Sequence, residues 1–180
     1  MKLITIIFAL LLPGAVFPQV TLKAGFTLGN RWNETLNSQT IGKGFRLIAE
    51  KNILPRLTVG AAVSYISFNP NAAVNVRYNA YNLLTAYYFN TKKLQPFVGA
   101  AFGYTNYQDN TTLNLGGGIS SKQERQKSYG NVSPFLGLKY HMDKKKKAAF
   151  FLQGNADFVP VATIDPIGFV SVVTGIAYQL

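Results

Sequence analysis

The last fourteen residues of the chain, 167–180, alternate between two kinds of side chain. Large apolar or β-branched residues occupy one set of alternate positions, and the other set includes Ser171, Gly175 and Gln179. A period of two is typical of a β-strand whose two faces meet different surroundings. In a transmembrane barrel one face contacts lipid and the other lines the interior. The pattern therefore predicts a barrel strand in this segment.

Seven further segments show the same alternation, and the connections between segments are alternately long and short. The predicted strands are 20–29, 43–51, 56–67, 77–90, 95–107, 129–142, 148–158 and 167–180. The short connections are 52–55, 91–94 and 143–147, and the long ones are 30–42, 68–76, 108–128 and 159–166. Short turns at one end and long loops at the other are typical of transmembrane barrels. The sequence thus predicts an all-β fold, an eight-stranded antiparallel up-and-down barrel over residues 20–180.

Only the fourth predicted strand, 77–90, leaves its two faces ambiguous, because both sets of positions contain apolar residues. We assign Leu83, Tyr87 and Phe89 to the outer face, since this choice turns Asn82 into the interior. In the other segments the charged, polar or very small residues fall mainly on one face, which we take as the inner one. Eight strands leave an interior that side chains nearly fill.

The first nineteen residues have the three regions of a secretory signal peptide. Lys2 precedes an apolar run over 3–12, and Pro13 and Gly14 then break the pattern. This run is too short for a transmembrane helix, which needs about 20 apolar residues. We therefore expect residues 1–19 to be removed on export, with the cleavage point open between Ala15 and Gln19.

The composition of the chain argues against several classes of function. The chain has 180 residues, enough for one domain, and a formal net charge of +11. Four of its basic residues form one run, 144–147, and the rest are scattered without interleaved aromatic residues, so nucleic-acid binding is not expected. The absence of cysteine excludes disulfides and lipoprotein acylation. The glycines at 116–118 lack the Lys-Ser/Thr of a phosphate loop, and we expect no cofactor and no metal.

Two segments resemble small outer-membrane β-barrel proteins of Gram-negative bacteria, the porin-like superfamily that includes the OmpX, OmpW and OmpA transmembrane domains. They are 95–104, with the sequence Gln-Pro-Phe-Val-Gly-Ala-Ala-Phe-Gly-Tyr, and 169–180. The resemblance covers about residues 20–180. It implies location in the cell outer membrane, contact with its lipids and lipopolysaccharide, and insertion by the barrel-assembly machinery. We expect a monomer.

The resemblance also implies that the terminal strand is the signal which the assembly machinery reads. The lipid-facing residues of this predicted signal are Val170, Val172, Ile176, Tyr178 and Leu180. Family members usually end on an aromatic residue, whereas this chain ends on Leu180 with Tyr178 two positions earlier.

Five charged residues fall on the predicted inner face: Lys23, Arg46, Glu50, Lys139 and Asp157. Charges inside a narrow barrel are costly unless they are paired, so we predict a salt-bridge network. The network could be a gate whose pairs exchange partners, or a rigid core that fills the barrel. The second interpretation is preferred because eight strands leave little open volume.

Three other features have both a functional and a structural interpretation. His141, the single histidine, could belong to a His-Ser-Glu triad such as some outer-membrane lipid-modifying enzymes use, but no serine and glutamate can be placed beside it. The lysines at 144–147 could bind anionic lipid headgroups or simply form a solvated turn. The connection 108–128 could bind a ligand or be a mobile loop. For His141 and the lysines we prefer the structural interpretation.

The sequence therefore favours a non-enzymatic integral outer-membrane β-barrel, either a structural envelope component or a narrow pore for small solutes. One alternative is a soluble eight-stranded barrel that binds an apolar ligand, as lipocalins do. Such a barrel would have its apolar face inside, the reverse of the pattern here. The other alternative is an outer-membrane lipid-modifying enzyme, for which no nucleophile and base can be assembled.

Overall fold

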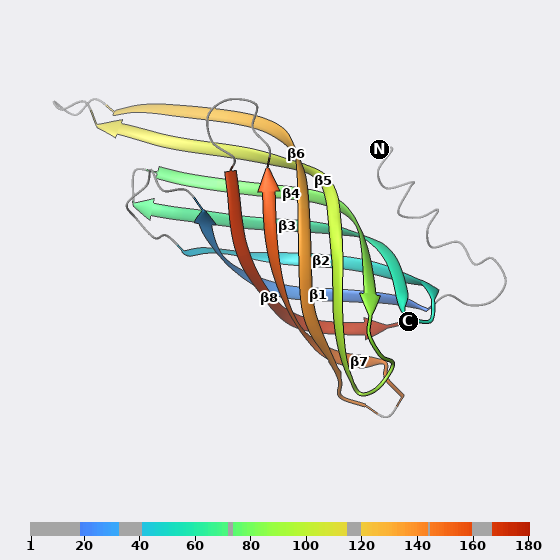
Figure 1. Ribbon diagram of the computed structural model, residues 1–180. Helices are drawn as coiled ribbons and strands as arrows, with labels where there is room; N and C mark the ends of the chain where they lie inside the picture. Colours follow the sequence, from blue (N-terminus) through green and yellow to red (C-terminus); the bar gives the residue numbers. More distant parts are fainter. Residues whose placement is uncertain (1–18, 33–40, 72–73, 115–119, 144, 160–166) are drawn as a thin grey trace.

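The chain forms a closed barrel of eight antiparallel strands in the computed structural model, which describes residues 19–32, 41–71, 74–114, 120–143, 145–159 and 167–180 (Figure 1). The strands are β1 (Val20–Trp32), β2 (Ile41–Leu54), β3 (Leu57–Asn71), β4 (Val74–Tyr88), β5 (Leu94–Asn114), β6 (Ser120–His141), β7 (Ala148–Val159) and β8 (Ile167–Gln179). Each strand pairs with its neighbours in sequence, and β8 closes the barrel against β1. The predicted fold is confirmed.

Within the described residues, no helix is long and apolar enough to cross a lipid bilayer. The predicted signal peptide falls almost wholly on residues 1–18, which lie outside the described residues.

The two faces of the barrel wall carry the side chains that the alternation predicts. Large apolar residues point outward around the barrel and are exposed, as Phe102 at 60% and Leu136 at 66% illustrate. The alternate positions point inward and are buried. The choice made for β4 is also confirmed, because Asn82 is buried whereas Leu83 and Tyr87 are exposed.

Two of the predicted long loops are largely strand. β5 and β6 pair continuously up to Asn114 opposite Ser120, so most of the predicted loop 108–128 is an extended hairpin (Figure 1). In the same way β3 and β4 continue to Asn71 and Val74, within the predicted loop 68–76. The prediction was wrong because it relied on apolar alternation. In the β5–β6 hairpin that signal disappears, because polar residues occupy successive positions such as 124–128, although strand pairing continues. The segment 68–76 was predicted to be a loop because of its proline and asparagines, although Phe68 and Val76 are buried apolar residues.

The barrel interior is not uniformly polar. Among the described residues, buried apolar side chains form three clusters, one around Ile48 and Phe97, one around Phe68 and Phe169, and a smaller one around Phe151. Polar and charged side chains lie among these clusters, as Lys23 does over the rings of Phe97 and Phe151. The interior is therefore layered along the barrel axis.

Candidate functional site in the barrel interior

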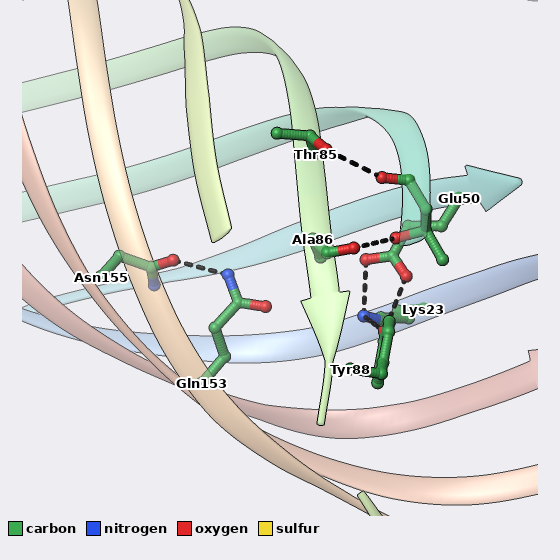
Figure 2. A network of polar contacts seen from close by, with 8 residues as sticks. Lys23, Glu50, Thr85, Ala86, Tyr88, Gln153 and Asn155 are labelled. Atoms are coloured by element: carbon green, nitrogen blue, oxygen red, sulfur yellow. Dashed lines mark hydrogen bonds and ion pairs between the residues drawn. The ribbon is translucent and has the colours of Figure 1, made fainter. Parts of the chain in front are cut away.

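The first layer is a buried triad of Lys23, Glu50 and Tyr88 (Figure 2). The Lys23 ammonium donates to Glu50 Oε1 at 2.6 Å and to the Tyr88 hydroxyl oxygen at 3.0 Å. The Tyr88 hydroxyl in turn donates to Glu50 Oε2 at 2.9 Å. Both carboxylate oxygens of Glu50 are thus engaged, and the three side chains form a closed ring of hydrogen bonds.

Strand register and aromatic packing hold this triad in place. Thr21 of β1 lies opposite Glu50 of β2, so Lys23, two residues further along β1, reaches Glu50 diagonally on the same inner face. The Lys23 ammonium also lies 4.8 Å from the ring centroid of Phe97 and 5.7 Å from that of Phe151. Such cation–π contacts are favourable when the charge is desolvated. The triad is a tightly constrained part of the core.

A second polar layer surrounds Arg46. Its Nη1 donates to Asn155 Oδ1 at 3.2 Å. Gln153 Nε2 donates to the same oxygen at 2.6 Å, as Figure 2 shows. Asn155 Nδ2 donates to Ser171 Oγ at 3.2 Å. Asp157 is buried and its charge acts on Arg46, but within the described residues no ion pair joins the two. The layer is thus an amide-centred network rather than a chain of salt bridges.

Aromatic side chains close the barrel above this layer, toward the loop end. The Tyr78 ring lies 5.6 Å from Phe68, 5.4 Å from Phe169 and 5.3 Å from Tyr107, centroid to centroid. A void of only about 10 Å³ lies between this cluster and the Arg46 layer. The interior is therefore filled at this level.

A larger cavity, of about 180 Å³, lies at the opposite end, where the three short turns meet. Its lining includes Glu50 and Lys139 from the barrel wall and Lys146 from the turn between β6 and β7. His141 and Gln95 also line it, with His141 Nε2 at 3.2 Å from Gln95 Oε1. None of the residues that line this cavity is a serine. His141 therefore faces a polar cavity that lacks the serine of a His-Ser-Glu triad.

The turn that carries the lysine run is ordered by Asp143. Its carboxylate accepts hydrogen bonds from the backbone N–H of Ala148 at 3.1 Å and of Lys147 at 3.2 Å. Desolvation is the largest single influence and acts to raise the pKa of Asp143, but the N–H groups together outweigh it and hold the pKa below its usual value. Lys146 adopts a left-handed backbone conformation with φ of 58°, and its ammonium donates to the Thr91 carbonyl oxygen. The described lysines of this run are exposed.

All five charged residues predicted to face inward are buried in the interior, but the structure joins only two of them in an ion pair. Lys23 and Glu50 form that pair, Arg46 and Asp157 share a layer, and Lys139 points into the turn-end cavity. Sequence reasoning missed Tyr88, which completes the triad. Alternation along β4 predicts that Tyr88 faces inward. An aromatic residue at that position does not by itself predict hydrogen bonds to a lysine and a glutamate.

The residues of the predicted assembly signal all point outward. Val170, Val172, Ile176, Tyr178 and Leu180 are exposed on the outer face of the barrel wall. Each therefore has the orientation that a lipid-facing signal needs, and their role in assembly stays a prediction.

Comparison with known proteins gives the architecture a context. No protein-family model matches the chain, and no curated protein matches it in sequence. Solved structures do match. Neisserial surface protein A aligns with a TM-score of 0.67 and 12% identity, over 89% of this chain and 97% of that one. Ail, the attachment invasion locus protein of Yersinia pestis, aligns with a TM-score of 0.60 and 10% identity, over 92% of this chain and 100% of that one. The fold is that of the small outer-membrane β-barrels.

A third match extends the same comparison. The N-terminal β-barrel domain of Pseudomonas aeruginosa OprF aligns with a TM-score of 0.50 and 17% identity, over 91% of this chain and 98% of that domain. At such low identities the likeness concerns the fold, and no residue role is transferred from these proteins to this chain.

Proposed function

We propose that this chain is a non-enzymatic integral protein of the outer membrane, a closed barrel that serves as a structural component of the envelope. The observation that carries the proposal is the inversion of polarity across the wall. Large apolar side chains are exposed on the outer face of every strand, whereas Lys23, Arg46, Glu50 and Asp157 are buried inside. In water the exposed apolar belt would be an aggregation liability, but in lipid it is the required surface.

The same inversion argues against a soluble ligand-binding barrel. A soluble barrel that holds an apolar ligand needs a largely apolar interior with free volume. Here the triad, the Arg46 layer and the aromatic cluster around Tyr78 occupy successive levels of the interior. The larger cavity is polar and lies at the turn end.

The filled interior also favours a structural role over a pore. A solute would have to displace the aromatic cluster at one level and the Lys23–Glu50 pair at another. Such displacement is unfavourable because removing a buried partner leaves an uncompensated charge. Under this proposal the short turns face the periplasm, and the outward residues of β8 are available to the assembly machinery during insertion.

Conductance in planar lipid bilayers separates the closed barrel from the pore. We expect the purified protein to show no discrete channel openings, and Glu50→Gln and Lys139→Gln to leave that baseline unchanged. Discrete openings that these substitutions alter would favour a gated pore instead. The folded state used in the recordings is verified by a heat-dependent shift in mobility on a denaturing gel.

A further inference from the structure

The turn-end cavity contains a charge that its surroundings do not neutralise. Lys139 is only 7% exposed and lines the cavity, and its ammonium lies 5.6 Å from the ring centroid of Tyr88. Across the part of the chain that the structure describes, this ammonium makes no ion pair and no hydrogen bond. The side chain as a whole is nearly buried while its ammonium lacks a protein acceptor, which is unfavourable because charged groups normally leave water only when they are paired.

The nearby carboxylate does not supply the missing partner. Glu50 also lines the cavity, but its two oxygens are engaged by Lys23 and by Tyr88. The Lys23–Glu50 pair is neutral as a unit, so Lys139 remains as excess positive charge. Lys146 at the rim of the cavity adds a second one. The cavity is therefore electropositive and polar.

Its remaining lining suits an anion that carries further hydrogen-bonding groups. Gln95, Asn52 and Asn90 contribute amides that can donate or accept. Thr58 contributes a hydroxyl oxygen that can accept, because its own proton is donated to the Ala86 carbonyl oxygen. A volume of about 180 Å³ has room for a phosphate ion or for the terminal residue of a peptide. The cavity is also reached from the side of the short turns rather than through the filled interior.

We propose that this cavity binds a single anionic group, a carboxylate or phosphate, with Lys139 as the principal binding residue and Lys146 at its entrance. The group belongs either to a free small anion or to the carboxyl end of a peptide chain. This inference is independent of the proposed structural role, because the site lies below the filled part of the barrel and does not require conduction.

The test uses the single histidine of the chain as a reporter. His141 lines the cavity, so its ring resonance in NMR spectra of the detergent-solubilised barrel senses what binds there. The probes are inorganic phosphate and acetyl-dialanine, with the amide of acetyl-dialanine as the uncharged comparison. We expect saturable shifts with at least one of the two anions and none with the amide. Tighter binding of acetyl-dialanine identifies a chain end, and tighter binding of phosphate a free anion.

Variants then locate the site. Lys139→Gln is expected to weaken binding roughly ten-fold or more, because a charge-assisted hydrogen bond is lost, whereas Lys139→Arg retains binding. Lys145→Gln is the matched control, since it removes the same charge from an exposed residue that does not line the cavity. If Lys139→Gln fails to fold, Lys146→Gln at the rim of the cavity is tested in its place. Lys146→Gln should weaken binding more than Lys145→Gln does. The absence of saturable shifts in the unmodified protein, or equal weakening by Lys145→Gln and the cavity variants, would overturn the proposal.

Discussion

At the scale of single residues, the structure depends on how a few buried charges are satisfied inside the barrel. Lys23 and Glu50 satisfy each other and Tyr88, whereas Arg46 relies on an amide. Lys23 is held by a carboxylate, a hydroxyl and aromatic rings together. Loss of one of these partners therefore leaves a buried charge or hydrogen-bonding group without its contact. We therefore expect the triad to be sensitive to mutation.

Substitution of Glu50 by glutamine should destabilise the barrel by about 3–5 kcal/mol, since it leaves the Lys23 ammonium buried without its counter-charge. The double variant Lys23→Met/Glu50→Gln should be less destabilised than Glu50→Gln alone, because no unpaired charge remains. Urea unfolding of the protein in lipid vesicles measures both. Glu124→Gln, at an exposed position of the β5–β6 hairpin, is the matched control. Equal stability of Glu50→Gln and Glu124→Gln would contradict the role assigned to the triad.

At the scale of strands and turns, the sequence predicts which segments form the barrel wall and which of their faces point outward. It predicts less well where the strands end. Apolar alternation located all eight strands and their faces, because the outer positions share one environment. It failed at the β5–β6 hairpin, where successive residues such as 124–128 are all polar. It also could not distinguish which inward charges meet, since that depends on register between strands and on side-chain reach.

Close approach of β2 and β3 makes Gly44 sensitive to enlargement. A Cβ at Gly44 would meet the backbone carbonyl oxygen of Tyr65 on the neighbouring strand, whereas a Cβ at Gly154 would have nothing within 4 Å. Gly44→Ala should therefore lower the free energy of unfolding by about 1–3 kcal/mol, as overpacking does. Gly154→Ala should be close to neutral. Urea unfolding checks the pair, and similar values for the two variants would refute the predicted clash.

The turn between β6 and β7 should weaken in acid. The pKa of Asp143 is lowered in the folded protein, so its contribution is complete above the ordinary pKa of an aspartate, about 3.9, and is lost as the pH falls through the lower folded value. Hydrogen-exchange protection of the Ala148 amide, corrected for the intrinsic rate, should decrease over that window. In Asp143→Asn the protection should be independent of pH there. A pH-independent amide in the unmodified protein would rule out this role of the carboxylate.

At the scale of the whole molecule, fold and function differ in how much the sequence reveals. The barrel follows from a requirement that acts on every strand, namely that one face meets lipid and the other fills the interior. The turn-end cavity follows from the convergence of side chains such as Lys139, Gln95 and Lys146 from separate strands and turns. No local sequence pattern predicts which side chains line this cavity, because their proximity depends on the register of the strands.

The central claim is that the exposed apolar face of the barrel contacts lipid, and collision measurements on spin labels test it most directly. Because the chain has no cysteine, single labels can be placed at Phe102→Cys, Leu152→Cys and, on the hairpin, Gln126→Cys. In lipid vesicles we predict that the labels at 102 and 152 collide with oxygen, which partitions into lipid, and are shielded from a water-soluble nickel chelate. The label at 126 should show the reverse. Free access of the nickel chelate to the labels at 102 and 152 would contradict the account.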